Sequence, residues 1–106
     1  MSEEKAQFVA NLVATPNPVP CGAGPGTTAI SWSTGNGLPG RIYVSVDSGP
    51  EQLFAEGAQG SKDAPWIGNG TTYEFRLYPG TERKTPVAVV SVTGSDLLWD
   101  LVSNAL

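Results

Sequence analysis

The feature that most constrains the fold of this chain is the strictly alternating run from Tyr73 to Tyr78. Its positions form two sets, with Tyr73, Phe75 and Leu77 on one parity and Glu74, Arg76 and Tyr78 on the other. Successive side chains of a β-strand point to opposite faces, so a period of two with aromatic residues is typical of a half-buried strand. The run therefore predicts a strand whose Tyr73 face lies in the core.

The residues before this run predict how the strand begins. Ile67 is followed by the glycine-containing corner 68–70, and then by Thr71, Thr72 and Tyr73. An apolar residue, a glycine turn and a Thr-x-Tyr sequence are typical of a tyrosine corner, in which the phenol hydrogen-bonds to backbone a few residues upstream. Such corners occur in β-sandwiches.

The rest of the chain is punctuated by turn residues, because 13 glycines and 9 prolines are spread among its 106 residues. Between them, apolar and alternating segments predict strands at 7–15, 27–33, 41–47, 52–56, 73–78 and 85–93. Residues 21–26 and the polar, glycine-rich segment 57–63 are expected to be turns or loops. Regularly spaced strands without an amphipathic helix between them favour an all-β, antiparallel, two-sheet sandwich of about seven strands over any βαβ arrangement.

The length is that of one domain. We expect a disordered N-terminal segment at 1–6, the sandwich at 7–94 and a tail or linker at 95–106. The tail has apolar residues at helical spacing after Ser95–Asp96, a pair able to cap a helix, so a short C-terminal helix is predicted. It either docks on the sandwich or begins a neighbouring domain.

Two segments resemble fibronectin type III domains. Residues 28–33, Thr-Ala-Ile-Ser-Trp-Ser, resemble that family's second strand with its core tryptophan. Residues 67–77 resemble its Leu-x-Pro-Gly-Thr-x-Tyr-x-Val-x-Val corner, with Asn69 standing where proline is usual. The aliphatic third strand at 42–46 departs from the aromatics often found there. Immunoglobulin-like sandwiches without a disulfide fit the same residues.

This resemblance implies a Greek-key sandwich that acts as a spacer or binding module. Bacterial members of the family often sit in extracellular or surface proteins. The resemblance and the alternation together predict a structural core, made of Ile30, Trp32, Ile42, Val44, Ile67, Tyr73, Phe75 and Leu77.

Composition argues against catalysis and cofactors. The chain has no histidine, which excludes Ser/His/Asp and Cys/His arrangements. Its single cysteine, Cys21, permits no intrachain disulfide and makes zinc ligation implausible. The acidic residues form no recognisable pair, and Asp47–Pro50 is better explained as a turn than as a calcium loop. We therefore expect no enzymatic activity, no metal and no cofactor.

The charge and the hydropathy pattern also limit the partners. A net charge of −4 with only six scattered basic residues argues against nucleic acid, which requires clustered Lys and Arg. No apolar run approaches the roughly 18 residues of a membrane span, so no membrane insertion is expected. The polar N-terminus is unlike a signal peptide. An extracellular or cell-surface location is favoured if the chain is excised from a longer one, and a cytoplasmic location otherwise.

The candidate binding residues are those expected to point outward from one sheet or its edge: Arg41, Tyr43, Trp66, Arg76 and Tyr78. Trp66 is placed among them because it precedes Ile67, which is expected to be buried. Tyrosine, tryptophan and arginine could stack on and hydrogen-bond to a sugar or a protein. The competing interpretation is cross-strand pairing on a solvated face, with Glu74 as a counter-charge. The edge segment 51–56 could also accept a peptide by β-augmentation.

The sequence thus predicts a non-catalytic module of a larger multidomain protein, serving as a spacer or protein-interaction domain. Its partners would be neighbouring domains or another protein. The alternative is an ancillary carbohydrate-binding module that uses the outward aromatic residues of one sheet.

Overall fold

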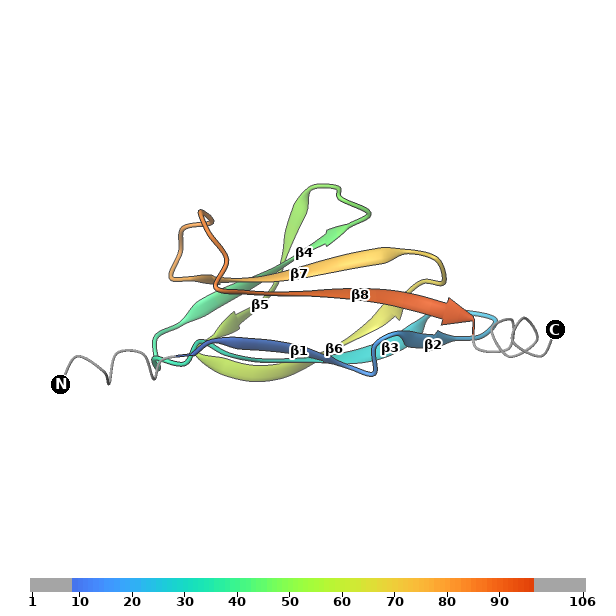
Figure 1. The fold of residues 1–106 in the computed structure, drawn as a ribbon, viewed down its shortest axis with the longest axis horizontal. Helices are drawn as coiled ribbons and strands as arrows, with labels where there is room; N and C mark the ends of the chain where they lie inside the picture. Colours follow the sequence, from blue (N-terminus) through green and yellow to red (C-terminus); the bar gives the residue numbers. More distant parts are fainter. Residues whose placement is uncertain (1–8, 97–106) are drawn as a thin grey trace.

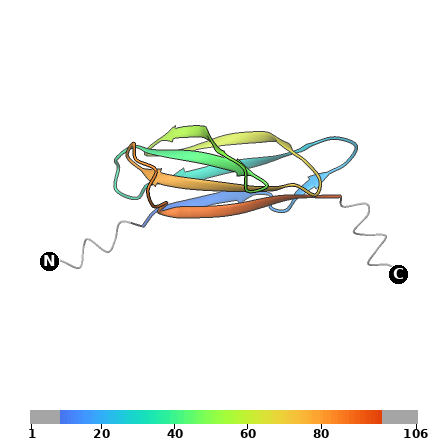
Figure 2. The same cartoon turned by 90° about the horizontal axis from the view of Figure 1, so that it is seen from above.

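The computed structural model describes residues 9–96, which form eight strands and no helix. In chain order the strands are β1 Asn11–Thr15, β2 Val19–Cys21, β3 Gly26–Ser33, β4 Gly40–Val46, β5 Glu51–Gly57, β6 Gln59–Ile67, β7 Thr72–Pro79 and β8 Ala88–Asp96. They form a three-stranded sheet in the order β1-β3-β6 and a five-stranded sheet in the order β2-β8-β7-β4-β5. Figures 1 and 2 show the two layers from directions at right angles. The all-β prediction is confirmed, and the two sheets are compatible with a sandwich.

Two strands were missed by the sequence prediction. β6 covers most of the segment expected to be a loop, and β2 lies in the proline-rich stretch after β1. β2 also pairs with β8 in parallel, so the expectation of purely antiparallel strands is wrong for this pair. Both strands lie at sheet edges. An edge strand can pair through its backbone without apolar side chains, as β6 does, and it tolerates proline, as β2 does.

The strand limits differ from the predicted ones mainly near the chain ends. β8 continues to Asp96, so Ser95 and Asp96, expected to cap a helix, are strand residues. It starts at Ala88 rather than at Thr85, and residues 80–87 form the connection from β7. The predicted N-terminal disorder at 1–6, the first residues of the predicted 7–15 strand and the helical spacing after residue 96 lie outside the described residues.

The core lies between the two sheets. All eight residues predicted for it are buried, and they belong to one hydrophobic cluster that also includes Leu12, Val19, Phe54, Ala64 and Val92. Phe75, Leu77, Ile30 and Ile42 are fully buried. Trp32 on β3 lies over Gly60 on β6, where an added Cβ would come within 2.9 Å of the indole. The indole Nε1–H donates a hydrogen bond to the carbonyl of Gly57 at 3.2 Å.

The hydrogen bonds expected of a tyrosine corner are present. The hydroxyl of Tyr73 donates to the carbonyl of Trp66 at 3.1 Å and accepts from the amide of Gly68 at 2.8 Å. Gly70 turns the chain between them with a φ of 77°, a conformation that favours glycine. The corner therefore fixes the end of β6 against the start of β7, which joins the two sheets.

Candidate functional site

The outward face of the five-stranded sheet carries four of the five predicted binding residues. The register of β4 and β7 places Arg41 opposite Tyr78 and Tyr43 opposite Arg76. Their alternation was thus predicted correctly. What the alternation did not indicate is that Arg76 and Tyr78 bind Glu51 of β5, that Tyr43 packs on Tyr78, and that Arg41 lies near Glu56 instead.

Glu51 is the centre of this outer-face cluster, which comprises Glu51, Arg76, Tyr78, Arg83 and Tyr43. Its Oε2 accepts hydrogen bonds from Arg76 Nη1 at 2.5 Å and from the Tyr78 hydroxyl at 2.6 Å, and its Oε1 accepts one from Arg83 Nη1 at 3.1 Å. The Arg83 guanidinium also lies 4.6 Å from the centre of the Tyr43 ring, which meets Tyr78 edge to face. Such charge-assisted hydrogen bonds are stronger than neutral ones.

The contacts of this cluster shift the titration of its members. Burial raises the pKa of Glu51, but the hydrogen bonds from Tyr78 and Arg76 and the charges of Arg76 and Arg83 outweigh it, so that its pKa lies below the usual value. Burial and the hydrogen bond to Glu51 raise the pKa of Tyr78. The hydrogen bonds to Glu51 and Glu74 raise the pKa of Arg76 further above neutrality. At neutral pH Glu51 is therefore a carboxylate, Arg76 is charged and Tyr78 is a neutral phenol.

This carboxylate should make stability depend on pH. A group whose pKa is lowered by folding stabilises the native state above its unfolded pKa, and the contribution is lost as pH falls through the folded pKa. We expect Glu51→Gln to lower the free energy of unfolding at neutral pH. At a pH below the folded-state pKa of Glu51, where the carboxyl group is protonated, the free energies of unfolding of the variant and the parent protein should differ less. Urea unfolding at both pH values tests this. Glu56→Gln is the control, because Glu56 is more exposed and lies 3.9 Å from Arg41; equal losses in both variants would contradict the prediction.

Because the polar groups of Arg76 and Tyr78 are already paired, these two residues offer little to a ligand. Tyr78 is only 6% exposed, and its hydroxyl is bound to Glu51. Arg76 is paired with Glu51 and Glu74. The contribution of Glu51 and Arg83 was not predicted. Glu51 comes close to Tyr78 only through the register of β5 with β4, where it pairs with Ser45, and Arg83 reaches the sheet from a loop that has no periodic pattern.

Trp66 was expected to point outward near a sheet edge; it is an exposed residue of the edge strand β6, and its ring also contacts aromatic residues of the core. β6 carries an irregularity against β3: between the paired positions Thr28–Ala64 and Gly26–Ile67, two residues of β6 stand opposite the single residue Thr27. This bulge interrupts the alternation, as bulges do. Trp66 therefore lies across the gap between the sheets, in contact with Phe54, Tyr73 and Phe75, and remains 40% exposed.

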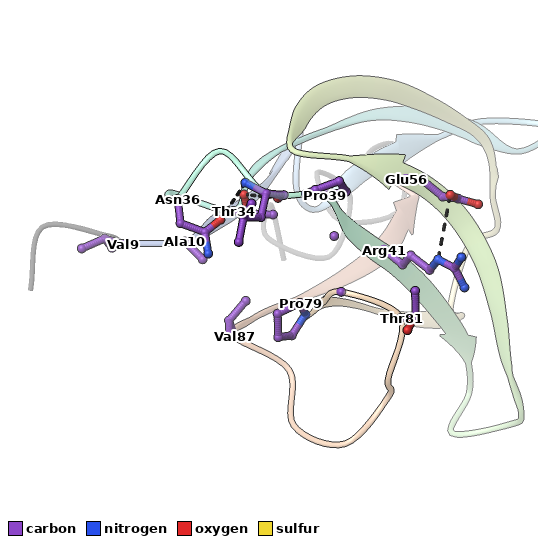
Figure 3. A pocket seen from close by; sticks show the side chains of 13 residues that line it. Val9, Ala10, Thr34, Asn36, Pro39, Arg41, Glu56, Pro79, Thr81 and Val87 are labelled. Carbon is purple, nitrogen blue, oxygen red and sulfur yellow. Dashed lines mark hydrogen bonds and ion pairs between the residues drawn. The ribbon is translucent and has the colours of Figure 1, made fainter. Parts of the chain in front are cut away.

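An open pocket of about 770 Å³ lies at the end of the molecule where β1 begins. It is lined by Val9, Ala10, Thr34, Asn36, Leu38, Pro39, Gly40, Arg41, Glu56, Pro79, Gly80, Thr81 and Val87. Figure 3 shows Thr34 and Pro39 on one side of this end pocket and Pro79 and Val87 on the other. Its size is within the range of ligand pockets, which are mostly apolar with a few polar groups.

The walls of the end pocket are fixed by local contacts. The hydroxyl of Thr34 donates to the carbonyl of Leu38 at 2.8 Å, which closes the β3–β4 turn. Gly35 has a φ of 82° and allows the backbone of Val9 to pack closely against it. A Cβ added to Gly35 would lie 2.5 Å from the carbonyl oxygen of Val9. On the other side, the 80–87 loop is held to the sheet by Arg83 through Glu51. The outer-face cluster thus supports one wall of the pocket.

Three side chains make this pocket apolar and accessible. Val9, Leu38 and Val87 are 66%, 63% and 50% exposed. Arg41 is the predicted binding residue that lines the pocket, and its Nε lies 3.9 Å from Glu56 at the rim. Tyr43, Trp66, Arg76 and Tyr78 lie elsewhere. Sequence reasoning missed Leu38 because an isolated apolar residue in a turn has no periodicity. It missed Val87 because that residue was assigned to the predicted strand 85–93, whereas β8 begins at Ala88.

The described part of the chain contains no group of three or more His, Cys, Asp or Glu residues able to hold a metal ion. Among the same residues there is no helix of the length and hydropathy needed to cross a membrane. Cys21 is buried, with its thiol 3.2 Å from the carbonyl of Ile67. Comparison with known proteins found no matching family model, curated protein or solved structure.

Proposed function

We propose that the chain is a non-catalytic, fibronectin type III-like or immunoglobulin-like module of a larger protein, which serves as a protein-interaction unit and spacer. The observation that carries this proposal is the apolar end pocket with its three exposed aliphatic side chains. Exposed apolar surface that is contiguous and rimmed by polar residues is a feature of protein contact sites. Arg41 and Glu56 supply such a rim.

The strand order supports the family assignment within this proposal. If β1 and β2 are counted as two parts of the first strand, its first part shares a sheet with the second and fifth strands. Its second part lies in the other sheet, with the third, fourth, sixth and seventh strands. Immunoglobulin constant domains place the fourth strand in the first sheet, so this order favours the fibronectin type III arrangement. The hydrogen bonds of Tyr73 support a Greek-key sandwich of this kind.

The position of the chain ends supports the spacer role. β1 begins at one end of the long axis, and the arrowhead of β8 lies at the opposite end (Figure 1). A chain that enters a module at one end and leaves it at the other can continue in line into neighbouring modules. The end pocket lies beside the entry point, because Val9 and Ala10 line it. A domain that precedes this one would face the pocket, which makes it the first partner to test.

Site-specific photo-crosslinking tests this proposal. A benzophenone amino acid replaces Leu38 at the pocket or Val13, which is similarly exposed but lies on β1 outside the pocket. The parent polypeptide is then irradiated in its native cells. We expect protein crosslinks from position 38, to a neighbouring domain or another protein, at several times the yield from position 13. Equal yields at the two positions would overturn the interaction role of the pocket.

A carbohydrate-binding role is the second candidate. The outward aromatic face is a poor location for it, because Tyr78 and Arg76 are already bound to Glu51. The observation that favours it is instead the partial exposure of Trp66, on a different surface from the end pocket.

A further inference from the structure

The flank between the two sheets carries a second concave site with a different chemical character. It is a notch of about 330 Å³ between β5 and β6, lined by Val44, Val46, Gln52, Leu53, Phe54, Lys62, Asp63 and Trp66. None of these residues lines the end pocket. Its volume is at the small end of the range for ligand sites, which corresponds to one ring-sized group rather than a long chain.

Trp66 forms a flat wall of this notch. Its ring is nearly parallel to that of Phe75, with an angle of 21° and 6.2 Å between the ring centres, and it meets Phe54 edge to face. Phe75 thus lies on one side of the indole, and 40% of Trp66 remains exposed. Trp66 is also one of the residues that line the notch. Three aromatic neighbours hold the indole in one orientation, so little side-chain entropy would be lost when a ligand stacks on it.

Polar side chains surround this aromatic wall. Gln52 and Asp63 are exposed at the notch, and between them they offer amide donors, an amide acceptor and a carboxylate acceptor. Lys62 is engaged elsewhere, because its Nζ donates to the carbonyl of Phe54 at 2.9 Å and lies 5.0 Å from the centre of that ring. The bond to Phe54 also occupies a backbone acceptor on the edge strand β5, which argues against addition of a peptide strand there.

An aromatic face beside an amide and a carboxylate matches the two surfaces of a sugar ring. A pyranose with equatorial hydroxyls presents axial C–H groups on its faces and hydroxyl groups around its rim. The electron-rich face of an indole attracts such C–H groups, while carboxylate and amide groups bind hydroxyls. The net charge of −4 is unfavourable for sulfated or polyuronic chains. We infer that the notch at Trp66 binds a neutral, equatorially substituted pyranose.

The test is an NMR titration of the full chain with cellopentaose, a neutral glucose oligomer. The indole N–H signal of Trp66, assigned by its loss in Trp66→Phe, should shift saturably with a dissociation constant of about 1–10 mM. Asp63→Asn and Gln52→Ala should each raise the dissociation constant by about two- to tenfold, which corresponds to the loss of one hydrogen bond. Trp66→Ala should abolish the response of the remaining notch residues.

Gln59→Ala is the matched control, because Gln59 is exposed on β6 but lies outside the notch. It should leave the dissociation constant unchanged. A heparin hexasaccharide should produce no saturable shift. Two results would overturn the proposal. One is the absence of a saturable shift when cellopentaose is in roughly 50-fold molar excess over about 1 mM protein. The other is undiminished binding by the double variant that combines Asp63→Asn and Gln52→Ala. These two variants change only exposed side chains, so the result does not depend on whether Trp66→Ala folds. A negative result in this titration would not bear on the proposed interaction role of the end pocket, which is a separate site.

Discussion

Trp32→Ala is expected to reduce the free energy of unfolding by about 3–5 kcal/mol, as removal of a buried aromatic side chain usually does. The indole is 7% exposed, covers Gly60 and donates to the carbonyl of Gly57. Its removal leaves a cavity in the core between the two sheets and deprives the Gly57 carbonyl of this hydrogen bond. Because domains of this size have only about 5–15 kcal/mol of stability, the variant should unfold at a temperature roughly 10–20 °C lower. Urea and thermal unfolding followed by circular dichroism measure both changes.

Trp66→Ala provides the comparison for this prediction. It removes the same side chain from a site that is 40% exposed and leaves no enclosed cavity. We expect it to cost about 1–2 kcal/mol, mainly from lost apolar burial against Phe75 and Phe54. Equal costs for the two substitutions would show that Trp32 is not the better-packed residue and would contradict the position assigned to it in the core.

Gly94→Ala should have the second-largest effect, about 2–3 kcal/mol, which is in the range of overpacking substitutions. An added Cβ would lie 2.2 Å from the carbonyl oxygen of Gly68 and 2.8 Å from the Cys21 thiol. Gly68 cannot easily move, because its amide is bound to the Tyr73 hydroxyl at 2.8 Å. The carbonyl of Gly94 itself accepts from the amide of Gly70 at 3.2 Å. The substitution should therefore disturb the tyrosine corner, and the same unfolding measurements would detect it.

Gly24→Ala is the control for this steric argument. An added Cβ at that position would meet no atom within 4 Å, and its φ is not in the left-handed region. The substitution should be neutral or stabilise the protein by up to about 1 kcal/mol, because alanine restricts the unfolded chain. If Gly24→Ala were as destabilising as Gly94→Ala, the loss could not be assigned to the approach of Gly68.

How far the fold could be predicted depended on whether each residue followed a regular period. Tyr73, Phe75 and Leu77 alternate without interruption, and all three are buried as expected. Residues 59–63 are exposed on an edge strand, so they carry no apolar signal although they pair with β3. Backbone hydrogen bonds hold such a strand in the sheet, and these bonds do not depend on the type of side chain.

The candidate sites were harder to predict than the fold, for two physical reasons. The position of Trp66 depends on a bulge, and a single inserted residue reverses every inference made from alternation. The state of Tyr78 depends on Glu51, which lies 27 positions earlier in the chain. That contact follows from the register of three strands, β5, β4 and β7, which the sequence of any one strand does not contain.

The parallel pairing of β2 with β8 has a consequence for how the molecule is assembled. Val19 is the partner of Gly94, so the five-stranded sheet joins segments from opposite ends of the described chain. Closing such a distant contact requires a large loss of chain entropy before any hydrogen bond forms, and domains rich in these contacts fold slowly. During synthesis the sheet cannot be completed until β8 has left the ribosome. Until then β7 presents an open edge to other nascent chains, which makes this interval the one in which chaperones would be needed most.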